Sequence, residues 1–234
     1  AYEICACLVG AEMCIRDSCC DFLERRLALC VDTAAPEPPA QKRTALLAQH
    51  DTMWLRIFDS ACAYCAALTE QVGQVPALFR EHALHTVHFL APCRPMMEMI
   101  ENQVYLAEGA YARVIGRSEG LLAQCAQQHY ALVALHVRIQ TAAAYAALGK
   151  RPEARSLLGQ ALREAEPDGL LLPFAENGRG LRPLLEGGAW EADLGDFPQR
   201  AADCIAAYEA RCAALCAPCL LYTSPSPRDM RRSR

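Results

Sequence analysis

The chain has 234 residues and a formal net charge of -4, with 23 lysines and arginines against 27 aspartates and glutamates. This acidic balance argues against a nucleic-acid clamp, because such proteins carry a basic face. Hydrophobic residues make up 53% of the chain and aromatic residues only 7%. Much of the apolar content is alanine and leucine, which favours helices over sheets.

Most of the 14 cysteines lie singly in stretches with helical apolar spacing. A small secreted domain held by disulfides would place them in turn-rich loops. We therefore expect reduced thiols that pack as small hydrophobic groups, in a cytoplasmic protein. No apolar run reaches the roughly 18 residues that a membrane span needs, and the first residues lack the pattern of a signal peptide. We expect no membrane partner.

Both ends of the chain resemble translated sequencing-library adapter. Residues 12–18 resemble a transposase end sequence, and residues 219–229 resemble the opposite strand of the same adapter. We interpret residues 1–18 and 219–234 as adapter-derived artefacts. The alternative for the second segment is a disordered basic tail. Under the first interpretation, the basic cluster near the end of the chain gives no indication of nucleic-acid binding.

Between these ends, apolar residues recur at steps of three and four, the period of a helix with one buried face. The spacing predicts helices, in chain order, over residues 22–30, 41–68, 78–88, 96–107, 111–127, 129–148, 152–165, 181–185 and 199–216. Three prolines within residues 36–39 interrupt the first two helices, and residues 173–178 have an irregular pattern.

A helical repeat is the strongest pattern in the sequence. An aromatic residue closes one helix, a glycine four residues later allows a left-handed turn, and small residues let the next helix approach closely. A looser copy precedes it by forty residues, more than the regular period of about 34. The residues that define the repeat are Tyr105, Gly109, Tyr145, Gly149, Ala154, Leu158 and Ala161.

This pattern predicts an all-α fold of tetratricopeptide-like stacked helix pairs, an α-solenoid with a concave surface. We expect six segments: the artefact 1–18, the end of a preceding region with a proline-rich linker at 19–40, the helical-repeat domain 41–186, a linker at 187–198, a helical segment at 199–218 and the artefact 219–234.

A resemblance to a known family rests on residues 129–186, above all 143–168 and 172–177, and on the upstream segment 75–114. These stretches resemble the helical-repeat region of large ATP-binding LuxR-type transcriptional regulators, of the maltose-operon-activator-like group. In that family an ATP-binding domain precedes the repeats and a helix-turn-helix domain follows them. The chain has no G-x-x-x-x-G-K-S/T phosphate loop. Residues 199–218 resemble the helix that leads to the DNA-binding domain.

The resemblance implies a non-catalytic signal-sensing or interaction domain of such a regulator. ATP and DNA would be bound only by the parent protein's other domains, and this part would need no cofactor. Its concave face would take a small-molecule inducer or a protein, and the parent would self-associate. The alternative is a free-standing helical-repeat adaptor that binds peptides or proteins. No arrangement of residues meets the first tests for an enzyme.

One polar segment after the repeat is a candidate site for a ligand or for contact between domains. It comprises Phe174, Glu176 and Asn177. The simpler interpretation, which we favour, is an Asx-type turn that connects two helices.

The pair Cys62 and Cys65 has the spacing of a redox or metal motif. A redox pair would be expected beside a strand-helix unit, and a zinc site needs a second ligand pair. We therefore favour packing in the core of a helix.

His82, His85 and His88 fall at steps of three along a predicted helix. A metal site is conceivable there, but the His-Glu-x-x-His order of metalloproteases is missing, and a half-exposed helix face is favoured. His129 and His136 are seven residues apart. We expect them on one helix face at an interface.

Overall fold

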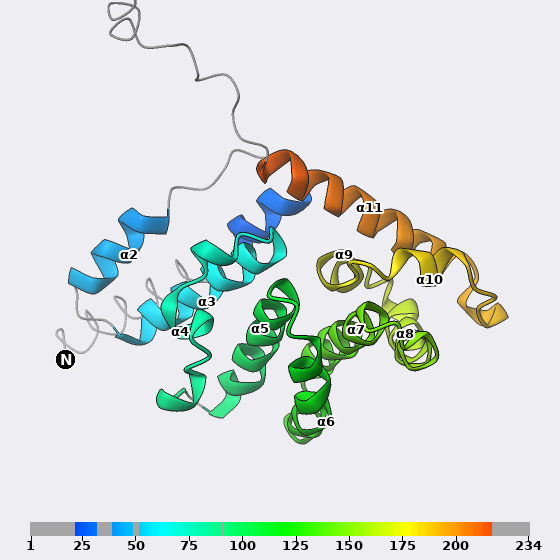
Figure 1. Cartoon of the computed structure of the whole chain (residues 1–234), viewed down its shortest axis with the longest axis horizontal. Helices are drawn as coiled ribbons and strands as arrows, with labels where there is room; N and C mark the ends of the chain where they lie inside the picture. Colours follow the sequence, from blue (N-terminus) through cyan, green and yellow to red (C-terminus); the bar gives the residue numbers. More distant parts are fainter. Residues whose placement is uncertain (1–21, 32–38, 49–51, 90, 217–234) are drawn as a thin grey trace, which may run out of the picture.

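The computed structural model describes residues 22–31, 39–48, 52–89 and 91–216 (Figure 1). These residues form helices and turns and contain no strand, so the prediction of an all-α fold is confirmed for them. Three predicted features lie outside the described residues: the adapter-like segments 1–18 and 219–234, and most of the proline-rich stretch 33–39.

A helix over residues 22–30 comes first, as the apolar spacing predicts. The labelled helices are α2 (Pro39–Ala48), α3 (Thr52–Leu68), α4 (Ala77–Arg80), α5 (Arg94–Ala107), α6 (Tyr111–Gln127), α7 (Ala131–Ala147), α8 (Arg151–Ala165), α9 (Leu172–Asn177), α10 (Arg182–Glu186) and α11 (Phe197–Cys216). Short 3₁₀ turns lie at Val72–Gln74, Leu84–Thr86, Ala91–Cys93, Glu166–Asp168 and Ala192–Leu194.

The turns that follow α5, α6, α7 and the 3₁₀ turn after α8 share one geometry. A residue in the left-handed region stands at Gly109, His129, Gly149 and Gly169, with φ of 74°, 57°, 74° and 63°. In each turn the next amide donates to the carbonyl five residues earlier, as from Ala110 to Tyr105 at 2.8 Å. This is the Schellman arrangement, which satisfies carbonyls that a helix end leaves open. The left-handed residues recur every twenty residues along the chain.

Helices α5 to α8 pack against one another in sequence order, and α5 also packs against α7. The close approach of α7 and α8 depends on small side chains, since Ala154 and Ala161 are fully buried and have no side chain beyond Cβ. Leu158 is also fully buried. Tyr105 is buried with Val114 and Ala144 in a small apolar cluster between α5, α6 and α7.

The last helices fold back over this array. Helix α9 packs against α7 and α11, and α11 packs against α10. Figure 1 shows α11 passing above α9 and α10 toward the helix over residues 22–30. There the Arg211 guanidinium donates from Nη2 to the Val31 carbonyl at 3.1 Å and from Nε to the Ala28 carbonyl at 3.3 Å. The first and last described helices therefore lie together.

Two sequence predictions about local structure are wrong. The stretch 173–178 is not irregular, because α9 begins at Leu172 and places Pro173 in its first turn, where the missing N–H costs nothing. The predicted helix 78–88 does not form either. Helix α4 stops at Arg80 because His82 adopts a left-handed φ of 53°, which an L-residue cannot adopt inside a helix.

A search of the described helices finds none that has both the length and the hydropathy of a membrane span.

Candidate functional site

A buried carboxylate, Glu176 on α9, lies at the centre of the molecule. Its side chain is fully buried. Arg26 binds it in a bidentate manner, with Nε 2.7 Å from Oε1 and Nη2 2.8 Å from Oε2, and the Tyr64 hydroxyl donates to Oε2 at 3.0 Å. A buried carboxylate is tolerated when a guanidinium and further hydrogen bonds compensate its charge. Glu176 thus joins the helix over residues 22–30, α3 and α9.

The neighbouring Asn177 connects α9 to α7. Its Nδ2 donates to the Pro173 carbonyl at 2.8 Å and lies 2.7 Å from His136 Nδ1, and its Oδ1 accepts from Gln140 Nε2 at 2.9 Å. Burial, with a further contribution from Arg26, lowers the pKa of His136 to about 3. The ring is therefore neutral at physiological pH and can accept from Asn177 on Nδ1.

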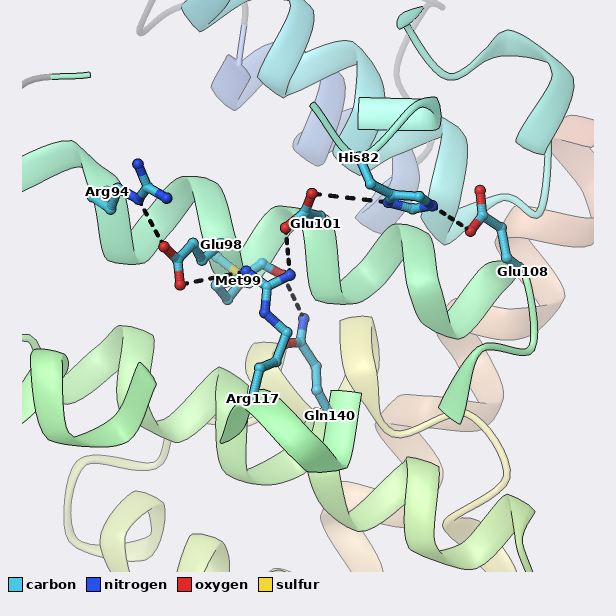
Figure 2. Close-up of polar contacts among 8 residues, drawn as sticks. All are labelled: His82, Arg94, Glu98, Met99, Glu101, Glu108, Arg117 and Gln140. Atoms are coloured by element: carbon cyan, nitrogen blue, oxygen red, sulfur yellow. Dashed lines mark hydrogen bonds and ion pairs between the residues drawn. The ribbon is translucent and has the colours of Figure 1, made fainter. Parts of the chain in front are cut away.

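Gln140 carries the network on to α5. Besides Asn177, its Nε2 lies 3.1 Å from the Met99 carbonyl and 3.3 Å from Gln103 Oε1. Figure 2 shows the contact with Met99. Gln140 is fully buried, so loss of this side chain would leave several polar partners unsatisfied in the interior. One connected polar network therefore links the helix 22–30 with α3, α5, α7 and α9.

A cavity of about 280 Å³ lies beside this network. The last residues of α3, α5 and α7, which are Leu68, Ala107 and Ala147, all lie in its wall. Its polar lining comprises Glu70, Gln103, Tyr111, Glu176, Asn177, Arg179, Tyr208 and Glu209. Alternate helices of the array thus end at one hollow, which α9 and α11 complete.

The exposed side chains of Glu70 and Arg179 form an ion pair at this cavity. Glu70 follows α3 and Arg179 follows α9. Because both groups are more than half exposed, water screens their attraction and the pair adds little to stability. Its effect is to set two opposite charges beside one another in the cavity wall.

Tyr208 of α11 lines the same cavity and is 7% exposed. Its hydroxyl is buried and has no hydrogen-bond partner among the described residues. Burial, with the nearby Glu176 charge, raises the pKa of Tyr208, so the hydroxyl stays protonated. A buried hydroxyl without a partner is costly, at about 1–3 kcal/mol. The hydroxyl oxygen is closed to solvent, so the cavity meets other atoms of Tyr208.

The three residues of the predicted polar turn do not form a turn. Phe174, Glu176 and Asn177 are buried on α9, and the ring of Phe174 packs edge-on against Phe197 at 6.0 Å. Glu176 and Asn177 do line the cavity. The other network residues have no signature in the sequence, since Arg26 is 150 residues from Glu176. Only the pair of a proline and a glycine around 173–178 could have indicated a short helix.

The predicted histidine face is also wrong. His82 lies in the turn after α4, where its ring stacks on Tyr105 at 4.1 Å, and the exposed His85 lies in a 3₁₀ turn. His129 is the left-handed residue before α7, so it does not share a helix face with His136. The search of the described residues finds no group of three or more His, Cys, Asp or Glu side chains that could hold a metal ion.

A row of ionisable side chains in contact with one another lies along α5 instead (Figure 2). His82 Nε2 lies 3.0 Å from Glu108 Oε2, and its Nδ1 lies 3.8 Å from the buried Glu101. Glu101 also pairs with Arg117 of α6. Arg117 reaches Glu98 at 3.3 Å, and Glu98 accepts from Arg94 at 2.7 Å. These contacts connect the turn after α4 to α5 and α6.

The Cys62 and Cys65 pair lies within α3. Burial raises the pKa of the Cys65 thiol to about 12. The thiolate, which is the nucleophile and metal ligand, is therefore scarce at this position at neutral pH. This agrees with packing of Cys65 against the apolar core of α3 and α5.

No protein-family model matches the chain. No curated protein matches it either, and no solved structure does. The described residues thus define an all-helical protein in which α3, α5 and α7 end at one cavity of mixed polar and apolar lining.

Proposed function

We propose that the chain is a tetratricopeptide-like sensor domain of a LuxR-type transcriptional regulator, which takes up a small molecule in the cavity beside Glu176. The twenty-residue spacing of the left-handed turns supports the repeat, because two helices and two turns then make one forty-residue unit. Tyr145 and Tyr105 occupy equivalent positions four residues before Gly149 and Gly109. The family itself is supported by the resemblance of residues 129–186.

One observation carries the proposal. The cavity is lined by the ends of α3, α5 and α7 and also by α11, and its Glu176 is held by Arg26. A ligand there would contact the repeat array and the last helix together, and it would act on the first helix through Glu176. Binding can shift a conformational equilibrium only through such differential contacts. Occupancy would therefore bias how the two end helices are held.

In this proposal the chain is cytoplasmic, performs no chemistry and needs no cofactor. ATP binding, DNA binding and self-association belong to the other domains that the family resemblance implies. The signal would pass from the cavity to those domains through the helix over residues 22–30 and through α11, which Arg211 holds together.

The genomic locus of the chain tests the family assignment. We expect one uninterrupted reading frame with a phosphate-loop domain upstream and a helix-turn-helix domain downstream. Unrelated sequence should replace residues 1–18 and 219–234 in reads that cross both junctions. Stop codons next to the helical core on both sides would contradict the regulator and favour the free-standing adaptor.

The sensor role has its own test in the protein encoded by that locus. Ala147 is exposed at the end of α7 and lines the cavity, so Ala147→Phe should fill the hollow without entering the core. We expect this variant to lose induction of a target-promoter reporter. The basal expression of the reporter and the thermal stability of the variant should stay as they are in the unchanged protein. Full induction by the variant would contradict a sensor role for the cavity.

A further inference from the structure

The wall of the cavity carries more negative than positive charge. Its carboxylates are Glu70, Glu176 and Glu209, and its single cation is Arg179. Arg26 neutralises Glu176, and Arg179 pairs with Glu70. Glu209 of α11 has no ion-pair partner among the described residues. One half-buried carboxylate therefore faces the hollow uncompensated.

The helix ends add to this field. Leu68, Ala107 and Ala147 are the last residues of α3, α5 and α7, and all three line the cavity. The carboxyl end of a helix carries a partial negative charge of about half an electron, which favours cations nearby. Three such ends line one hollow, where charges are screened less than on an open surface.

The remaining lining residues suit an organic ion. Tyr111 and Tyr208 offer aromatic rings, and the faces of such rings attract cations. Apolar side chains between them, including Leu106 and Ala143, can cover a short hydrocarbon body.

We propose, on the basis of the sensor function above, that the cavity binds a small organic cation: an amine with a short apolar body. The ammonium group pairs with Glu209 near the three helix ends, and the hydrocarbon body lies against Leu106 and Ala143. A matched anion would meet Glu209 and the helix ends with like charge, and a neutral alcohol would leave the carboxylate unpaired.

The test titrates the full 234-residue chain with n-butylamine, butyrate and n-butanol, which share one hydrocarbon body. Binding is followed by saturation-transfer NMR and by the shift in thermal unfolding. We expect saturable binding of butylamine that is at least about tenfold tighter than that of butyrate or butanol, since like charge and an unpaired carboxylate both cost affinity.

Two variants locate the site. Glu209→Gln should weaken butylamine binding about fivefold or more, because it removes the paired charge, and Ala147→Phe should abolish it. Glu119 is exposed on α6 and outside the cavity, so Glu119→Gln is the matched control and should bind as the unchanged chain does.

Three results would overturn the proposal. Preference for butyrate or butanol, lost in Ala147→Phe, would refute the cation while leaving a small-molecule sensor intact. Butylamine binding that neither variant changes would place the amine elsewhere. Saturable binding of none of the three probes would also refute it, and the reporter experiment with Ala147→Phe would then decide separately on the sensor function.

Discussion

The helices α5 to α8 and the helices α9 to α11 follow different rules. The four helices of the first region have 14 to 17 residues, and the same left-handed turn follows α5, α6, α7 and the 3₁₀ turn after α8. In the second region α9 has only six residues and α10 five. The first region gains its order from local turns and small apolar side chains, whereas α9 places Glu176 and Asn177 in the interior.

We interpret this difference as a division between helices that stabilise the fold and helices that form the proposed binding site. Helices α5 to α8 pack against one another in sequence order, so most of their contacts join neighbouring helices. The buried groups of α9 need partners far away in the chain, such as Arg26 and Tyr64. A buried charge is retained at an energetic cost, which suggests a role beyond stability. We propose that this role is ligand binding at the cavity, where the two regions meet.

The largest effect should come from breaking the buried ion pair. Arg26→Met leaves Glu176 buried without its guanidinium, and we expect a loss of about 3 kcal/mol in the free energy of unfolding. Arg200 pairs with Asp196 at 3.9 Å on the exposed surface, so Arg200→Met should change it by less than about 0.5 kcal/mol. Denaturant titrations measure both, and an equal response would contradict the distinction.

A second substitution tests the apolar packing between α7 and α8. Leu162 on α8 is fully buried, and Leu162→Ala should cost about 2–5 kcal/mol by opening a cavity. Leu132 on α7 is 54% exposed, so Leu132→Ala serves as the control with little expected change. If urea unfolding showed a cost below about 1 kcal/mol for Leu162→Ala, the packing of α7 on α8 would be wrong.

Two substitutions at the left-handed turns should change stability in opposite directions, with smaller effects than those above. A Cβ at Gly149 would meet nothing within 4 Å, so Gly149→Ala should cost about 1 kcal/mol through its left-handed backbone alone. The same argument predicts that His129→Gly gains up to about 0.5 kcal/mol, since His129 already pays that conformational strain. Thermal unfolding of both variants measures the pair, and effects with reversed signs would contradict the shared turn geometry.

The polar network should also make stability depend on pH. His136 has a pKa of about 3 in the folded chain and about 6.5 when unfolded. The unfolded chain therefore binds an extra proton between these values, so stability falls as pH drops from about 6.5 toward 3. His136→Gln should flatten this slope in unfolding measurements, whereas the exposed His85→Gln should leave it unchanged. An unchanged slope in His136→Gln would exclude this histidine as its source.

The sequence predicts helices α5 to α8 better than the rest of the chain. Helix lengths and turns depend on local apolar spacing and on glycine, so Gly109 and Gly149 are visible in the sequence. His129 and His82 hold the same left-handed conformation, which histidine adopts more readily than most residues but far less readily than glycine. Apolar spacing carries no sign of this backbone conformation, so it predicts the histidine helix wrongly.

The candidate site is harder to predict for a related reason. Glu176 and Asn177 stand out only as polar residues near a proline and a glycine, a pattern that equally favours an exposed turn. Their burial depends on Arg26 and Gln140, which lie 150 and 37 residues away. Spacing cannot reveal such partners, because no periodic rule connects distant helices.

The central claim is that the cavity at the ends of α3, α5 and α7 is a binding site for a small organic cation. The most direct measurement is an amide NMR titration of the ¹⁵N-labelled chain with n-butylamine. We expect saturable shifts that cluster at Ala107, Ala147 and Tyr208, which line the cavity from three helices. Shifts confined to other surfaces, or no saturable shifts, would contradict the claim.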